Sequence, residues 1–153
     1  MNSNHIKRLC QHFNLGDPTQ EPQRVSGGLL HIMWQLNTDK GSFAIKQLSK
    51  DINLTDYHVI RNYELSENIA SGFIALGIPA VTAIEKSGKH LFIINETGFL
   101  VYPWVNAKAL DKDAVSVLKL WKLLGFYLRC ISSICSARKL KKQNLIFMKG
   151  AKL

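Results

Sequence analysis

The chain has 153 residues, with 20 Lys and Arg against 11 Asp and Glu, so its formal net charge is +9. This length and a hydrophobic content of 46% suit one folded domain and exclude a disordered chain. The three cysteines lack the spacing of metal ligands, which excludes a disulfide scaffold or zinc module and indicates a cytoplasmic protein. No transmembrane segment is expected, because Lys119, Lys122 and Arg129 interrupt the apolar run near the C-terminus.

The basic charge lies at one end of the chain. Residues 1–117 contain 11 basic and 11 acidic side chains, and residues 118–153 contain nine basic side chains and no acidic one. The last acidic residue is Asp113. Such a break in composition indicates a boundary between regions of different role or origin.

The first predicted element is a helix over residues 4–15. Ile6, Leu9 and Phe13 repeat there at helical spacing, and the Gly-Asp-Pro run at 16–18 ends the helix. We interpret it as a packing helix without chemistry of its own.

Three strands are predicted next. A short strand over residues 23–25 precedes a hairpin, whose strands cover residues 30–36 and 42–48. The polar segment 37–41 between them ends in a glycine and is typical of a hairpin turn.

A second helix and two more strands follow. An apolar stripe predicts a helix over residues 57–76, with an N-cap at 55–56 and an end at the Gly-Ile-Pro run 77–79. Strands are predicted over residues 91–95 and 98–105. The order of elements predicts an α+β fold. It consists of a five-stranded antiparallel sheet with one helix packed on one face, an N-terminal helix and a helical basic tail.

Three features of the neutral region suggest phosphate chemistry. Ser26-Gly27-Gly28 lies between two strands, where glycines let backbone N–H groups approach a phosphate, although such a pair also suits an ordinary turn. Lys46 lies in the third strand, on the face opposite Ile45, where it either faces solvent or needs a partner. Glu64 and Glu67 share one face of the next helix, so either carboxylate is a candidate partner for Lys46.

A glycine loop, a lysine on the third strand and a glutamate on the next helix follow one another as in the small lobe of a kinase. The runs GGLLHIMWQLNTDKGSFAIKQLS, YELSENIASGFIALGIPAV and FLVYPWVNAKAL together resemble the aminoglycoside phosphotransferase and choline kinase family. The resemblance covers about residues 20–115 and implies ATP- or GTP-dependent phosphorylation of a hydroxyl on a small molecule. It implies that Lys46 binds phosphate and that Glu67, with Glu64 in reserve, holds its ammonium.

The resemblance also implies a nucleotide-binding linker at the end of the last strand. There the C=O of Pro103 and the N–H of Val105, behind Tyr102, would bind the edge of the base. Proline keeps its acceptor and lacks a donor, so Pro103 is compatible with the first role. The sequence departs from the family at His31, where family members commonly carry Asn.

Phosphoryl transfer needs a carboxylate to accept the hydroxyl proton and further ligands for Mg²⁺. In the family these lie on a large lobe, and this chain has no Asp or Glu beyond Asp113. We therefore expect a kinase-like small lobe over residues 18–113, preceded by the helical segment 1–17. We expect the large lobe to be absent, no catalytic or metal-binding residue to be present, and the chain to be inactive alone.

Three interpretations of the basic tail, residues 114–153, remain open. It is an amphipathic helix on a membrane surface, a packing helix that replaces the large lobe, or the product of a frameshift. The third is the interpretation we favour, because the codons of Trp121-Lys122 and Met148-Lys149 each encode Glu in a shifted frame.

The sequence thus predicts a truncated phosphotransferase. Its expected ligands are ATP or GTP and, in the full-length form, a small-molecule hydroxyl acceptor, with no nucleic acid. The alternative is a non-catalytic basic protein that binds an anionic membrane or nucleic acid through residues 118–153.

Overall fold

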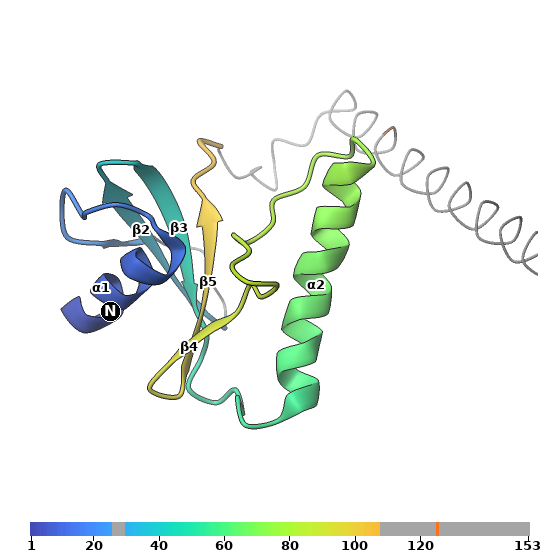
Figure 1. Cartoon of the computed structure of the whole chain (residues 1–153), viewed down its shortest axis with the longest axis horizontal. Coiled ribbons are helices and arrows are strands. Elements are labelled where there is room, and N and C mark those ends of the chain that lie inside the picture. Colours follow the sequence, from blue (N-terminus) through green and yellow to red (C-terminus); the bar gives the residue numbers. More distant parts are fainter. Residues whose placement is uncertain (26–29, 108–124, 126–153) are drawn as a thin grey trace, which may run out of the picture. The chain divides into compact units, whose positions relative to one another are not determined.

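The computed structural model of the chain describes residues 1–25, 30–107 and 125. Within these residues lie two helices and five strands: α1 (Ser3–Phe13), β1 (Gln23–Val25), β2 (Ile32–Thr38), β3 (Gly41–Gln47), α2 (Tyr57–Ala75), β4 (Phe92–Ile94) and β5 (Thr97–Pro103). The strands form one antiparallel sheet in the order β1-β2-β3-β5-β4 (Figure 1). The α+β class and the five-stranded antiparallel sheet are therefore confirmed.

The chain divides into two compact units. The first joins Met1–Gly72 to Ala80–Asn106, so it contains α1, all five strands and most of α2. The second joins Phe73–Pro79 to Ala107–Leu153. In its described part, Gly77 has φ +72° and the N–H of Ile78 donates to Phe73 C=O at 2.9 Å, which makes the glycine-terminated helix end that the sequence predicts.

Helices cover both faces of the sheet, which is more than the sequence prediction of one packed helix. Ile6, Leu9 and Phe13 of α1 form a core cluster with the buried strand residues Ile45 and Phe99 on one face. α2 lies on the opposite side (Figure 1). The N-terminal helix is therefore part of the same core as the strands, because its apolar stripe covers a face that α2 leaves open.

A second core cluster lies between the sheet and α2. Leu48 and Leu100 are buried there, and Ile60 and Tyr63 of α2 pack against them. Because side chains alternate along a strand, Lys46 shares the α2 side with Leu48, whereas Ile45 belongs to the α1 side. The predicted alternation of the third strand is confirmed.

Strand bounds differ from the prediction by up to two residues. The hairpin between β2 and β3 closes with the pair Thr38 and Gly41, so only Asp39 and Lys40 form its loop. The Thr38 hydroxyl donates to Leu15 C=O at 2.6 Å, a contact from outside the hairpin that the local sequence does not reveal. As a result β2 spans Ile32–Thr38, two residues later than predicted.

Replacing Leu100 by alanine should strongly destabilise the fold. Leu100 has no exposed surface and packs between the sheet and α2. We expect Leu100→Ala to lower the free energy of unfolding by about 2–5 kcal/mol in urea denaturation. Leu65→Ala on α2 is the control, since Leu65 is 51% exposed and its loss should change stability by less than about 0.5 kcal/mol.

Candidate functional site

A groove of about 600 Å³ opens on the α2 side of the sheet, a volume within the range of small-molecule sites. Its lining residues come from the chain before β2, from β2, β3 and β5, and from the segments after α2 and β5: Leu30, His31, Met33, Ala44, Lys46, Val81, Tyr102, Pro103, Trp104 and Val105. Four predicted nucleotide-binding residues, Lys46, Tyr102, Pro103 and Val105, are among them. Ser26, Gly27 and Gly28 lie outside the described residues.

The rim of the groove is apolar and open to solvent. Leu30 is 79% exposed, Val81 53% and Val105 51%. Each exposed apolar side chain costs free energy in water, and a ligand with an apolar face would lower this cost where it covers one of them. Pro103, which precedes Trp104 and Val105, pairs with Phe43, whereas His31, next to Leu30, binds Ser49 beyond the other end of β3. The end of the groove at Pro103 and Val105 is suited to a flat, uncharged group.

At the end of β5, the backbone C=O groups of Val101 and Pro103 point away from the neighbouring strand β3. The N–H of Trp104 donates to Ser42 C=O at 3.1 Å, so the neighbouring pair of Pro103 and Phe43 is a pair without mutual hydrogen bonds. The C=O of Val101, which by the same alternation points the same way as that of Pro103, accepts the N–H of Ile84 at 2.7 Å. Pro103 C=O is thus directed to the side from which a ligand edge can approach.

Lys46 supplies the positive charge of the groove. Its Nζ lies 6.0 Å from the centre of the Tyr63 ring on α2, at the limit of a cation–π contact. No carboxylate forms an ion pair with Lys46 within the part of the chain that the structure describes. The ammonium is therefore held near an aromatic face and keeps its hydrogen-bond donors for a ligand.

His31 lies beside Lys46 in the lining. Its Nδ1 accepts the N–H of Ser49 at 3.3 Å, and its ring meets the Tyr63 ring edge-on, with centroids 6.3 Å apart. Burial, with a smaller contribution from the Lys46 charge, lowers the pKa of His31 below its usual value. A neutral ring whose Nδ1 accepts a hydrogen bond carries its proton on Nε2.

Glu67 is the buried carboxylate of α2, and donors other than Lys46 hold it. The Tyr102 hydroxyl donates to Oε1 at 2.7 Å, and the N–H of Ala83 donates to Oε2 at 2.8 Å. The Thr82 hydroxyl lies 3.4 Å from Oε2 as well. The predicted pair of Lys46 and Glu67 is not formed among the described residues, because these donors already satisfy the carboxylate.

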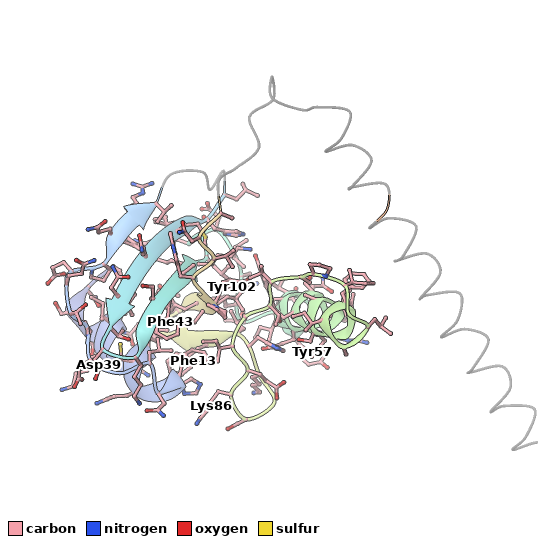
Figure 2. The ribbon with its side chains drawn as sticks, turned by 90° about the horizontal axis from the view of Figure 1, so that it is seen from above. Phe13, Asp39, Phe43, Tyr57, Lys86 and Tyr102 are labelled. Carbon is pink, nitrogen blue, oxygen red and sulfur yellow. The ribbon has the colours of Figure 1, made fainter. Side chains whose placement is uncertain are left out.

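Tyr102 connects the groove to this carboxylate, since it lies between the strands and α2 (Figure 2). Its ring lines the groove, whereas its hydroxyl is bonded to Glu67. Burial and then the Glu67 carboxylate raise the pKa of Tyr102 far above its usual value. The hydroxyl therefore stays protonated and remains a donor to Glu67.

Glu64, the reserve partner for Lys46, is held in the same manner. Its carboxylate accepts the N–H groups of His90 and Leu91 at 3.0 and 2.9 Å, and the His90 ring Nδ1 lies 3.0 Å from Oε2. Burial raises the pKa of Glu64, but the two backbone bonds and the His90 ring outweigh it, so the pKa lies below the usual value. Both candidate carboxylates thus fasten α2 to the segment before β4.

Several lining residues were not predicted from the sequence. Ala44 lies two residues from Lys46 on β3, and Met33 pairs with Lys46 from β2. Both side chains therefore lie on the same face of the sheet as Lys46. The period of two would have found Ala44, given Lys46. Val81 lies in an irregular segment with no sequence signal, and the sequence suits Trp104 equally to the core and to the rim of a pocket.

The groove fits a nucleotide better than it fits Mg²⁺. Its apolar rim suits a base, and Lys46 suits a phosphate. Magnesium requires oxygen ligands, chiefly carboxylates, and the lining contains no Asp, Glu, Asn or Gln among the described residues. Nor does the described part of the chain contain a group of three His, Cys, Asp or Glu side chains that could hold a metal ion.

A larger hollow, of about 840 Å³, lies on another side of the fold, between α1 and the segment that follows it. Its lining carries charges of both signs, including Lys40 and Asp39. The Lys40 ammonium is bonded to Asn14, and the Asp39 carboxylate accepts the N–H of Asp17. These side chains stabilise the loop, so the smaller groove at Lys46 is the better candidate site.

A scan against protein-family models and a search of curated proteins both find no match for this chain. In the part that the structure describes, no helix combines the length and the apolar character needed to cross a membrane.

Removing the Tyr102 hydroxyl should destabilise the fold. Tyr102→Phe leaves Oε1 of the buried Glu67 without its donor, which we expect to cost about 1–3 kcal/mol of unfolding free energy in urea denaturation. Tyr57→Phe is the matched control, because Tyr57 is 69% exposed at the start of α2. Equal stabilities of the two variants would contradict a structural role for the Tyr102 hydroxyl.

Acid should remove the contribution of Glu64 to stability. The folded pKa is lowered from 4.5, so this contribution is complete above that pH and is lost as the pH falls through the lowered folded value. We expect Glu64→Gln to melt at a lower temperature than the wild type at pH 7, and the difference to narrow below about pH 4.5. The exposed Glu85 provides the control, since Glu85→Gln should show no such narrowing.

Proposed function

We propose that the groove beside Lys46 binds ATP or GTP, and that the fold around it is the small lobe of a small-molecule phosphotransferase of the aminoglycoside and choline kinase type. The observation that carries the proposal is the position of Lys46. It lies on the third strand of a five-stranded antiparallel sheet and lines a groove whose other side chains are mostly apolar. In kinases the phosphate-binding lysine occupies the third strand as well.

The base would lie at the end of the groove formed by Pro103 and Val105. Val105 offers an apolar contact there, and Ala44 on β3, which pairs with Tyr102, leaves room beside Lys46 for a flat ring. The C=O of Pro103 is directed away from the sheet ladder and is available to an amino group of a purine. Apolar burial with a few placed polar groups is the usual way in which proteins bind such rings.

The phosphates would lie at the end formed by Lys46. Its ammonium neutralises part of their charge and fixes their distance from the base. Its Nζ lies over the Tyr63 ring at 6.0 Å, which favours this position of the ammonium by a weak cation–π attraction. Ser26, Gly27 and Gly28, which precede the groove-lining Leu30 along the chain, are proposed to cover the phosphates.

The proposed contribution of this chain to phosphoryl transfer is binding and orientation. Transfer to a hydroxyl also needs a carboxylate that accepts its proton, and none of the described residues lining the groove is acidic. When a complete catalytic site is present, Mg²⁺ supplies charge neutralisation at the transferring phosphate. We expect the chain alone to bind nucleotide and to phosphorylate no acceptor, and measurable turnover would contradict this.

The proposal predicts nucleotide binding that depends on Lys46. Isothermal titration of the full chain with ATP should give saturable binding, and Lys46→Ala should weaken it by about 10-fold or more through the loss of a charge-assisted hydrogen bond. Lys86→Ala removes an equal charge from an exposed turn away from the groove and should leave the affinity unchanged.

Two outcomes would count against the nucleotide site. Equal loss in both variants would indicate a general effect of net charge rather than a contact at Lys46. Retention on anionic vesicles or nucleic acid that falls with added salt, and that is lost when residues 118–153 are deleted, would favour the alternative of a basic binding protein.

A further inference from the structure

Among the described residues that line the groove at Lys46, one side chain is charged and none is acidic. Of its ten described lining residues, Lys46 alone carries a permanent charge, and His31 is the other ionisable side chain besides Tyr102. The raised pKa of Tyr102 and its bond to Glu67 leave its hydroxyl engaged. The electrostatic character of the groove is therefore set by Lys46 and His31.

The carboxylates nearest in the fold face other donors. Glu67 accepts from Tyr102 and from the Ala83 N–H, and Glu64 accepts from His90 and Leu91. Turning either carboxylate toward a metal ion would leave buried backbone N–H groups without acceptors, which is costly. α2 thus provides no ready ligand for a cation bound with the phosphates.

His31 adds a second donor next to Lys46. The Ser49 N–H occupies Nδ1, so a neutral ring has its proton on Nε2, and no residue that the structure describes bonds to Nε2. Tyr63 contacts both side chains, with its ring 6.0 Å from Lys46 Nζ and 6.3 Å from the His31 centroid. Both donors therefore lie near the same aromatic side chain of α2, at the same end of the groove.

We propose that Lys46 and the Nε2–H of His31 form an anion site that binds the phosphates of a nucleotide without a divalent cation. This inference rests on the proposed nucleotide site and specifies the form of the ligand that the site takes. The free nucleoside triphosphate carries two more negative charges than its Mg²⁺ complex, and it interacts more favourably with a site whose charge is the Lys46 ammonium. Magnesium would lower that attraction, and the described lining offers no carboxylate or side-chain amide to bind the ion in return.

The test is isothermal titration of the full chain with ATP, once in EDTA and once with excess Mg²⁺ at the same ionic strength. We expect binding in EDTA to be tighter by about threefold to tenfold. Binding that requires Mg²⁺ would overturn the inference and leave the nucleotide site standing, and it would point to Asp111 or Asp113, which lie outside the described residues. No binding of ATP under either condition would overturn the nucleotide site itself.

The role of His31 is tested with a pair of variants. His31→Phe keeps a ring against Tyr63 but removes the donor, and should weaken ATP binding in EDTA by about 10-fold. His31→Gln keeps an N–H donor and should recover part of the loss. Equal affinity of the wild type and His31→Phe would overturn the assignment of His31.

The wild-type protein gives an independent measurement that does not depend on the folding of a variant. Nitrogen-15 spectra of the histidine rings should show His31 with its proton on Nε2 at pH 7.5, and ATP in EDTA should shift the Nε2 signal more than the Nδ1 signal. A proton on Nδ1, or an Nε2 signal that ATP leaves unchanged, would overturn the role of His31 as a donor.

Discussion

The buried carboxylate of Glu67 is the interaction on which the arrangement of this fold depends. It lies on α2 and binds both the Tyr102 hydroxyl of β5 and the N–H of Ala83 in the segment after the helix. A buried carboxylate that lost these donors would be strongly unfavourable. This cost holds α2, β5 and the segment after the helix in their positions relative to one another. One turn earlier on α2, the Glu64 carboxylate likewise accepts hydrogen bonds, from the backbone N–H groups of His90 and Leu91.

The same interaction determines the chemistry of the groove. Because Glu67 is engaged with Tyr102, Lys46 on the neighbouring strand keeps its charge without a carboxylate partner among the described residues. The Tyr63 ring orients the ammonium without neutralising it. A structural requirement of the helix therefore leaves a cation oriented toward solvent at the end of an apolar groove, which is a suitable arrangement for an anion with a hydrophobic part.

Sequence patterns predicted the helices and strands, but they did not predict which groups these elements contact. The period of two along β3 correctly placed Lys46 opposite Ile45, and the i, i+3 spacing correctly placed Glu64 and Glu67 on one helix face. The competing donors could not be predicted, because Ala83 and His90 contribute backbone N–H groups of irregular chain, which no residue type marks. The packing of α1 on the second face was also missed, since an apolar stripe shows that a helix is buried but not against which surface.

The lengths of the strands have a consequence for the behaviour of the folded protein in concentrated solution. The two outer strands, β1 and β4, have three residues each, whereas the inner strands β2, β3 and β5 have seven. An outer strand exposes unpaired backbone groups that can recruit a strand from another molecule, and the risk grows with its length. Because β1 and β4 are short, they give an incoming chain few backbone groups to pair with, which limits aggregation through these two outer strands.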